Sequence, residues 1–409
     1  MKTRFLLIST FLIISLKINA QVFGCTDPLA NNYNANATKN NGTCTYNATT
    51  ADVVSSSNLP SQLLETSGLT FWNNSLFTHN DNDDLKIYAI DTTNGSIINS
   101  YNLNGTANVD WEEISQDENY LYVGDFGNNS SGNRTNLKIL RLDKNSILNN
   151  NLKIDTINFS YSNQTEYTAT TANKTDFDCE AFIVTTDSIY LFTKQWNTNQ
   201  TSLYALSKTP GTYTAQYKKS YDVQGLVTGA TLLENKKLVV LCGYNTLLQP
   251  FTLLLYDYEA NDFFSGNKRK INLNLAFHQV EGIATNNGLK YFISNEFFTK
   301  SVVTVNQKLQ NLNFYPYLSN YLGLTNTGIK TELQNNAISI YPNPVKHTLS
   351  IDLKYNNINC NYLIINNIGK VILEGNLTQN TNKINVESLQ IGVYQLVINN
   401  HQTIKFIKE

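Results

Sequence analysis

The sequence predicts an all-β protein in which a β-propeller of five blades, or alternatively six, is followed by a small β-sandwich. The composition favours strands and turns over long helices, because only 15% of the 409 residues are charged while 24 Tyr and 19 Phe are present. Runs of strand length with partial apolar–polar alternation recur between turns rich in Asn, Gly and Asp. These runs repeat at the spacing of four-stranded propeller blades.

The charge balance argues against a protein that binds nucleic acid. The chain carries 30 Lys+Arg and 32 Asp+Glu, and residues 1–20 contain three of the bases and none of the acids. A chain that starts at Gln21 therefore has a net charge of −5. Nucleic-acid binding would require a concentrated basic surface instead.

The first twenty residues predict a signal peptide for the Sec pathway. Lys2 and Arg4 precede the apolar run 5–16, and Ala20 supplies a small residue before the cleavage point. The expected mature N-terminus is Gln21, although a buried N-terminal helix is the alternative. No later stretch reaches the roughly 18 uncharged apolar residues that a membrane helix needs, so no transmembrane segment is expected.

Residues 21–50 predict a small module closed by a disulfide between Cys25 and Cys44. The segment between these cysteines has too few apolar side chains to form a core, so a crosslink would stabilise it most. It resembles a small module of secreted Bacteroidetes proteins, in the motifs Gly24-Cys25-Thr26-Asp27-Pro28, Asn32-Tyr33-Asn34 and Gly42-Thr43-Cys44. In that module an acidic stretch before the second cysteine looks able to hold a cation, but this chain has Lys39-Asn40-Asn41 there. A disulfide-closed linker is therefore the expectation, and Cys179, Cys242 and Cys360 are expected as buried thiols.

Residues 51–325 predict the propeller. Candidate inner strands start at residues 67, 112, 180, 229 and 281, and runs such as 76–78, 121–123, 189–192 and 291–293 predict the second strands. Third strands are expected at 86–90, 137–140, 202–206, 253–256 and 302–305. A sixth blade would have to combine residues 52–64 with the segment after Leu309. A β-sandwich or two stacked barrels is the remaining alternative, because periodicity does not establish closure.

The repeat region also resembles a family of mostly uncharacterised bacterial secreted propellers. The resemblance covers nearly all of the region and depends on motifs that include Val109-Asp110-Trp111-Glu112-Glu113-Ile114, Gly124-Asp125-Phe126-Gly127-Asn128-Asn129, Asp178-Cys179-Glu180-Ala181 and Glu281-Gly282-Ile283-Ala284. It implies a propeller but no particular activity. Gly229 stands where other units have Glu, which breaks the ring of acids at that unit.

The repeat alignment predicts a site at one mouth of the central channel. The start of a blade's first strand and the end of its antiparallel second strand lie at the same mouth. The candidate site residues there are Asp110, Glu112, Asp178, Glu180, Glu281, Asp125, Lys194 and His79. Crowded carboxylates raise one another's pKa or attract a cation, and Glu112, Glu180 and Glu281 are the candidate metal ligands. Oxygen ligands favour calcium or magnesium over zinc, while acids that only cap strand starts are the alternative.

The sequence leaves the activity open. It contains no GxSxG elbow, P-loop, HExxH motif or dinucleotide glycine fingerprint. The run 79–84 mimics part of a calcium loop but is expected to be a solvated turn. We expect an extracellular binding protein that captures a ligand, such as a glycan or a cation complex, at the channel mouth. The alternative is a metal-dependent hydrolase of esters, lactones or phosphates, and a structural surface-layer role is third.

After a polar linker at 326–336, residues 337–409 predict the β-sandwich. Alternating strands are expected at 349–353, 362–368, 370–374, 383–386, 392–398 and 403–407. This segment resembles the C-terminal sorting domain of the type IX secretion system, in the motifs Tyr341-Pro342-Asn343-Pro344, Asn367-Ile368-Gly369-Lys370-Val371, Ile391-Gly392-Val393-Tyr394 and Lys405-Phe406-Ile407-Lys408. The resemblance implies that the type IX machinery is a partner and that the protein is secreted or attached to the outer cell surface. An unrelated immunoglobulin-like domain is the alternative.

Overall fold

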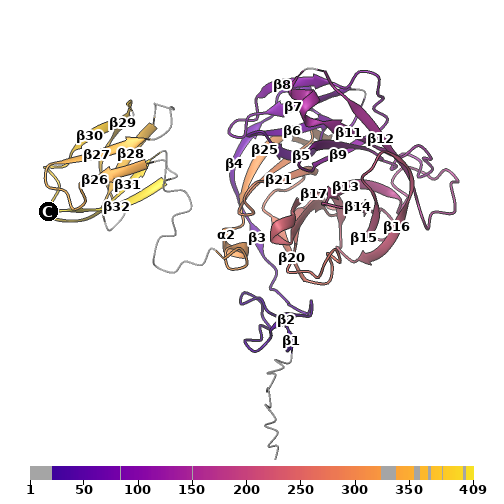
Figure 1. Cartoon of the computed structure of the whole chain (residues 1–409), viewed down its shortest axis with the longest axis horizontal. Coiled ribbons are helices and arrows are strands. Elements are labelled where there is room, and N and C mark those ends of the chain that lie inside the picture. The colour runs from indigo at the N-terminus through magenta and orange to yellow at the C-terminus, as the bar shows by residue number, and fades with distance from the viewer. Residues whose placement is uncertain are drawn as a thin grey trace, which may run out of the picture. The chain divides into compact units, whose positions relative to one another are not determined.

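The computed structural model describes residues 21–82, 84–149, 151–323, 338–353, 360–366, 370–379, 381–398 and 402–409. The chain forms two compact units, Met1–Thr325 and Asn326–Glu409 (Figure 1). The expected signal peptide at 1–20 and the expected linker at 326–336 lie outside the described residues. No helix in the described ranges is long and apolar enough to cross a membrane.

The first unit is a five-bladed β-propeller, which confirms the preferred blade number. The first blade contains β5 (Thr66–Trp72), β6 (Ser75–Asn80), β7 (Lys86–Ile90) and β8 (Ile97–Asn102), and the second contains β9 (Trp111–Gln116), β10 (Tyr120–Asp125), β11 (Lys138–Asp143) and β12 (Ile154–Tyr161). The third contains β13 (Asp178–Val184), β14 (Ser188–Lys194), β15 (Thr201–Ser207) and β16 (Gly211–Tyr221), and the fourth contains β17 (Leu226–Leu233), β18 (Leu238–Tyr244), β19 (Pro250–Tyr256) and β20 (Asn267–Leu273). The fifth contains β21 (Val280–Thr285), β22 (Lys290–Asn295), β25 (Lys308–Asn313) and β4 (Val53–Asn58). The inner strands β5, β9, β13, β17 and β21 pack against one another in a closed ring.

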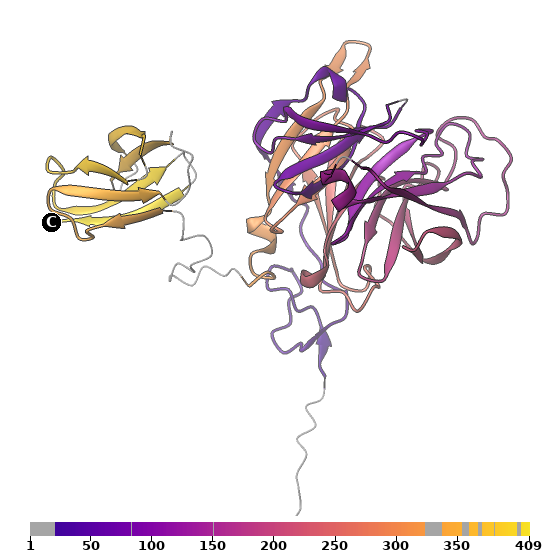
Figure 2. The ribbon, with the colours of Figure 1, turned by 45° about the horizontal axis from the view of Figure 1, so that its top comes forward.

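The ring is closed by the N-terminal strand β4, which pairs antiparallel with β25 as the outermost strand of the fifth blade. The segments that the sixth-blade alternative would have combined, residues 52–64 and the chain around Leu309, therefore complete the fifth blade instead. The expected third strand at 302–305 is wrong, because Val303–Val305 forms β24 of a separate hairpin with β23 (Phe298–Lys300). This hairpin is inserted between β22 and β25 and projects at the top of Figure 2. Sequence spacing could not separate the insertion from the blade, because both segments have strand-like composition.

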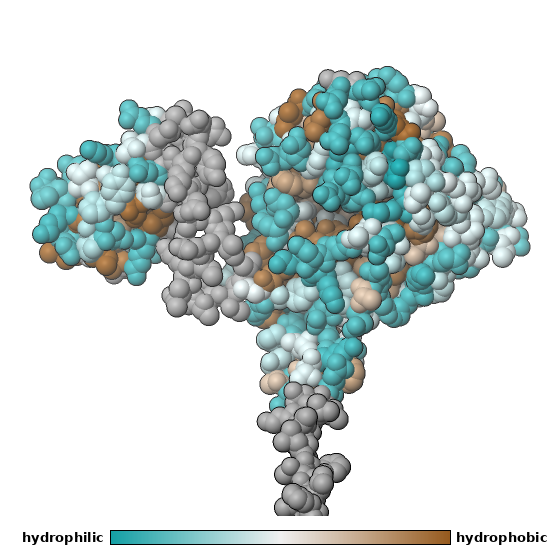
Figure 3. Space-filling model, in the orientation of Figure 1, coloured by the Kyte–Doolittle hydropathy of each residue, from teal (hydrophilic) through white to brown (hydrophobic). Residues whose placement is uncertain are grey.

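The middle strands explain why alternation along the sequence is only partial. Every residue of β18 and β19 is buried, because each face of a blade packs against a neighbouring blade. The outermost strand β8 is mostly exposed instead. Between blades, Phe77 and Ile87 pack with Trp111, Ile114 and Val123 in one apolar cluster. On the face shown in Figure 3, hydrophilic residues cover most of the propeller.

The propeller also contains one sheet that extends over two blades and two short helices. The outermost strands β12 and β16 pair in parallel, which joins the second and third blades into one eight-stranded sheet. The short helices α1 (Lys144–Leu148) and α2 (Tyr315–Leu318) lie in connections, and Asp143 caps α1 by accepting a hydrogen bond from the Ser146 N–H.

The N-terminal module is fastened to the outer edge of the fourth blade. It contains β1 (Phe23–Gly24), β2 (Lys39–Asn40) and the Cys25–Cys44 disulfide, and β3 (Thr50–Ala51) then pairs in parallel with β20. The Tyr46 and Tyr256 hydroxyls both donate to Asp27 Oδ2, at 2.7 and 2.5 Å.

The Lys39-Asn40-Asn41 stretch has a docking role in this structure. The Asn40 amide donates to Asp257 Oδ2 at 3.0 Å and to Asn267 Oδ1 at 2.9 Å. Within the same interface, the Arg269 guanidinium lies 4.8 Å from the ring centroids of both Tyr46 and Tyr317. The module is therefore an integral part of the first unit.

The second unit is a small β-sandwich. One sheet contains β26 (Ile338–Tyr341), β27 (Thr348–Leu353) and β30 (Thr381–Asn385), and the other contains β29 (Val371–Leu377), β28 (Cys360–Ile365), β31 (Gly392–Ile398) and β32 (Gln402–Lys408). Leu349 and Ile351 of the first sheet share one core with Ile364, Leu396 and Phe406 of the second. Alternating apolar residues from both sheets thus face each other, as the strand pattern predicts.

Candidate functional site at the acidic mouth of the channel

A β-bulge in each inner strand sets the direction of the side chains at one mouth of the channel. The pairing register skips one residue at Glu112, Glu180, Thr228 and Glu281, and it shifts between Ser67 and Thr70 in the first blade. Bulges re-aim side chains and recur near functional sites. The register corrects the sequence alignment by one residue in the fourth blade, where Thr228, and not Gly229, occupies the Glu position. Weak side-chain similarity between the units hid this offset.

The strand register places the starts of first strands beside the ends of second strands, as the topology predicts. Asp178 pairs with Lys194, and Val280 pairs with Asn295. A cavity of about 180 Å³ opens there, and its wall includes the carboxylates of Asp81, Glu112, Glu180, Glu281 and Glu296. Together with Asp178, these six carboxylates define what we call the acidic mouth.

Three carboxylates of the acidic mouth converge closely. Carboxylate oxygens of Glu112, Asp178 and Glu180 all lie within 4.8 Å of one another, and the three side chains are buried. The Asn128 N–H donates to Asp178 Oδ1 at 2.6 Å, and the Trp196 indole N–H donates to Asp178 Oδ2 at 2.8 Å. The sequence-based metal set is thus only partly assembled, because Asp178 and not Glu281 completes the closest group.

Asp110 adds a fourth carboxyl to this group. A Cβ added to Gly127 would lie 2.1 Å from Glu112 Oε1 and 2.4 Å from Asp110 Oδ2, so these two oxygens share the space that the glycine leaves open. Burial, followed by the nearby Asp178 charge, raises the pKa of Asp110 to about 6. Gly127 is therefore required for the paired carboxyls to approach the backbone.

Lys194 supplies the cation that lies among these acids. Its Nζ donates to Glu180 Oε2 at 2.5 Å and to the Tyr244 hydroxyl at 3.1 Å, and it lies 4.8 Å from the Trp196 ring centroid. Burial lowers the pKa of Lys194, but Glu180 and the other nearby anions overcome that effect and hold the pKa well above its usual value. Lys194 is thus a permanent internal counterion that balances one carboxylate.

The carboxylates of the acidic mouth resist ionisation together. Burial raises the pKa values of Glu112 and Glu180 well above the ordinary range. At Glu112 the charges of Glu180 and the neighbouring aspartates add to this effect, whereas at Glu180 Lys194 opposes it and Asp178 adds to it. Burial also raises the pKa of Glu281 to about 7, although Lys194 opposes the increase. These groups must share protons or bind a cation at neutral pH.

A second acidic group was missed by the sequence reasoning. Carboxylate oxygens of Glu65, Asp81 and Glu296 lie within 4.8 Å of one another, and burial followed by the Glu65 charge raises the pKa of Asp81 to about 7. Each residue lies directly outside a strand, before β5, after β6 or after β22. The expectation of a solvated turn at 79–84 is wrong for Asp81, which lines the cavity. The position of Asp81 directly after the second strand of its blade could have indicated from the sequence that it lies at this mouth.

Two predicted site residues lie in other surroundings. Asp125 is buried and its charge is compensated by Arg134 at 2.7 Å and Lys138 at 3.0 Å. His79 is fully buried, and its ring meets the Trp111 ring edge-on with centroids 5.8 Å apart. Burial lowers the pKa of His79 to about 4, so the imidazole is neutral at physiological pH. Neither residue belongs to the cavity wall.

Glu113 closes the channel behind the acidic mouth. Its Oε1 accepts the N–H groups of Leu69 and Ile114, at 3.2 and 3.0 Å, and its Oε2 accepts the N–H of Ala230 at 2.7 Å. These donors come from three different blades. The equivalent positions in the other blades hold Gly68, Ala181, Gly229 and Gly282, which leave room for one long side chain. Burial raises the pKa of Glu113, and the three N–H donors oppose that effect.

Fold and site together define a β-propeller with an acidic channel mouth, attached to a C-terminal β-sandwich. Residues 339–409 of that sandwich match the secretion system C-terminal sorting domain family. The protein is therefore exported by the type IX secretion system to the cell surface or the extracellular space, and the type IX machinery is its partner.

The whole chain was also compared with curated proteins and with solved structures. No curated protein matches the chain. Among solved structures, the chain is similar to PorZ, described as an essential bacterial surface component of the type IX secretion system of Porphyromonas gingivalis. The two share 14% identity with a TM-score of 0.30, and the match covers 84% of this chain and 45% of PorZ. The chain thus spans less than half the length of PorZ. A protein of unknown function from Dyadobacter fermentans has 10% identity, a TM-score of 0.37, and coverage of 64% and 98%.

A putative 6-phosphogluconolactonase from Bacteroides uniformis is also similar, with 9% identity, a TM-score of 0.30, and coverage of 81% of this chain and 88% of that chain. All three TM-scores lie below 0.5, so these likenesses carry no argument about fold or function.

Proposed function

We propose that the exported propeller is an extracellular binding protein whose acidic mouth holds a divalent cation, most readily Ca²⁺. The observation that carries this proposal is the convergence of the buried carboxylates of Glu112, Asp178 and Glu180 within 4.8 Å, with Glu112 and Glu180 on the wall of the cavity. Three buried carboxylates that share one internal lysine leave negative charge without a counterion. A bound cation would remove the cost of that arrangement.

The donor set favours a hard cation. All the converging groups are carboxylates, and calcium prefers oxygen ligands at 2.3–2.6 Å. Two oxygens bound to one calcium ion are at most about 5 Å apart, which the three carboxylates satisfy without large movements. Magnesium needs shorter bonds and a stricter octahedron, so it would require the carboxylates to move closer. Glu281 lies on the same cavity wall and would bind through water or add charge.

The test is metal analysis combined with thermal unfolding of the mature full chain. We expect calcium to raise the melting temperature and EDTA to lower it, with an affinity in the range of extracellular calcium modules, about 10⁻⁴–10⁻³ M. The double variant Glu112→Gln and Glu180→Gln should lose this response, while the exposed control Glu166→Gln should keep it. No calcium response in the wild-type chain would refute the proposal.

A hydrolase is the second candidate, because Asp110 and Glu112 form a carboxyl pair in which burial raises the pKa of Asp110 to about 6. A group with that pKa can exchange a proton near neutral pH, as general acid–base catalysis requires. A screen of ester, lactone and phosphate substrates with and without calcium tests this role. Turnover that Asp110→Asn abolishes would favour the hydrolase, and calcium binding without turnover would favour the binding protein.

A further inference from the structure

The opposite mouth of the channel contains a separate cavity that the proposed cation site does not use. This cavity has a volume of about 330 Å³, near the lower end of ordinary small-molecule sites. All five blades contribute to it at the ends of their inner strands, through Thr70, Ser115, Thr185, Thr231 and Thr285. We call these five residues the hydroxyl mouth. Glu113 separates this mouth from the acidic mouth.

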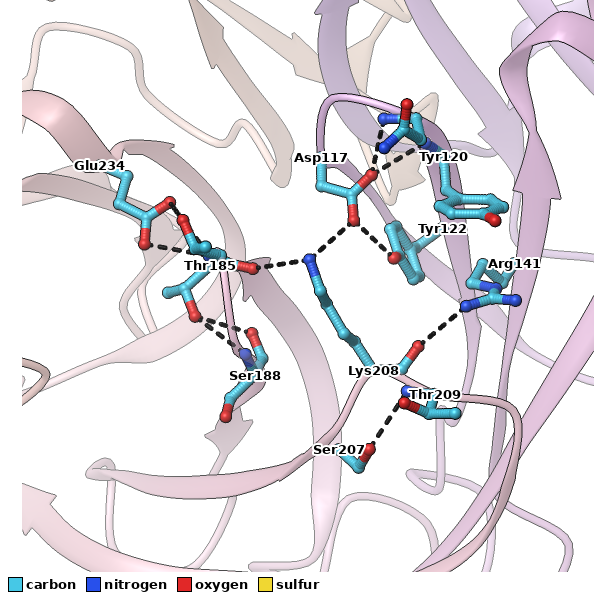
Figure 4. A network of polar contacts seen from close by, with 12 residues as sticks. Asp117, Tyr120, Tyr122, Arg141, Thr185, Ser188, Ser207, Lys208, Thr209 and Glu234 are labelled. Carbon is cyan, nitrogen blue, oxygen red and sulfur yellow. Dashed lines mark hydrogen bonds and ion pairs between the residues drawn. The ribbon is translucent and has the colours of Figure 1, made fainter.

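The rim of the hydroxyl mouth is held in place by contacts between neighbouring blades (Figure 4). Lys208 of the third blade donates to Asp117 Oδ2 of the second blade at 3.0 Å and to the Thr185 carbonyl at 3.3 Å. Glu234 of the fourth blade accepts the Thr186 N–H at 3.0 Å and the Thr186 hydroxyl at 2.9 Å. The site is therefore preformed, which reduces the ordering cost of binding.

The charges of the rim are already used within the protein. Asp117 accepts hydrogen bonds from Lys208, from the Tyr122 hydroxyl at 2.8 Å and from two backbone N–H groups. A charged ligand would have to break these bonds, and the acidic side chains Glu118 and Glu234 on the wall disfavour an anion. The apolar part of the wall consists of Val184, Ala230 and Leu232, which offers no flat aromatic platform.

Several hydroxyls on the wall remain available. Within the described part of the chain, the side-chain hydroxyls of Thr70, Ser115 and Thr231 have no hydrogen-bond partner, and Thr70 is only 8% exposed. None of these three hydroxyls is among the buried side-chain atoms that lack a partner, so they are accessible from the cavity and can donate to and accept from a ligand that replaces water there. We propose that the hydroxyl mouth binds an uncharged, hydroxyl-rich ligand of the size of a single sugar unit.

The experiment titrates the full mature chain with glucose, galactose, mannose and N-acetylglucosamine by isothermal calorimetry and NMR, with gluconate as the anionic comparison. We expect at least one neutral sugar to bind and gluconate to bind more weakly. Thr70→Val and Thr231→Val should each weaken the affinity about three- to tenfold, because each removes one hydroxyl at nearly constant volume. Thr231→Ser should restore binding.

The control Thr299→Val lies on the exposed β23–β24 hairpin and should have no effect. If a valine variant fails to fold, Ser115→Ala at the half-buried wall position gives the same test. The inference is overturned if no neutral sugar binds at 20 mM, on the order expected for weak sites. It is equally overturned if gluconate binds best, or if the hydroxyl variants leave the affinity unchanged.

Discussion

Replacement of Glu113 by alanine should destabilise the propeller strongly, because this side chain joins three blades inside the channel. Glu113→Ala leaves the N–H groups of Leu69, Ile114 and Ala230 without their acceptor. A buried donor without a partner costs about 1–3 kcal/mol, so three of them should lower the unfolding free energy by about 3–9 kcal/mol. That is a large fraction of the ordinary stability of a domain, about 5–15 kcal/mol.

The assay is urea denaturation of the mature chain, followed by tryptophan fluorescence at constant calcium. Glu113→Gln should have an intermediate effect, because its amide oxygen still accepts the two bonds that Oε1 makes, while its NH₂ group faces the Ala230 N–H. The exposed control Glu166→Ala should change stability by less than about 0.5 kcal/mol. A loss below about 1 kcal/mol for Glu113→Ala would refute the reasoning, since water or a neighbouring group would then satisfy the three donors.

The acidic mouth leads to three further predictions. In the calcium-free protein, the melting temperature should fall as the pH rises from about 4 to 8. Burial raises the pKa values of Asp110 and Glu281 to about 6 and 7, so the folded state binds their protons more tightly than the unfolded state does. A melting temperature that rises with pH over this range would contradict this prediction. Lys194→Gln should lower the melting temperature without calcium and increase calcium affinity in calorimetry, because it removes the cation that is paired with Glu180; unchanged affinity would count against a shared site. Gly127→Ala should abolish the calcium-induced rise in melting temperature, because its Cβ would lie 2.1 Å from Glu112 Oε1; an intact response would show that Glu112 is not a ligand.

Much of the acidic mouth could be predicted from repeat symmetry. Asp110, Glu112, Asp178, Glu180 and Glu281 recur at equivalent starts of inner strands, and antiparallel pairing brings those starts to one mouth. The alignment failed by one residue at Thr228, because the bulge register depends on backbone hydrogen bonds that the side chains do not encode. It also gave no role to Glu113, which is meaningful only beside the small residues of the other four blades.

The sequence by itself determined the class of fold, the disulfide between Cys25 and Cys44 and the sorting domain, because these follow from local patterns such as alternation, spacing and short motifs. Tertiary structure decided how the ring closes, since β4 and β25 meet only after the whole propeller has formed. It also decided which acids converge. Glu65, Asp81 and Glu296 lie outside the strands in sequence, and their proximity depends on the blades being closed around one axis. Contacts between distant segments follow from that closure and not from any local pattern, so they become visible only in the folded chain.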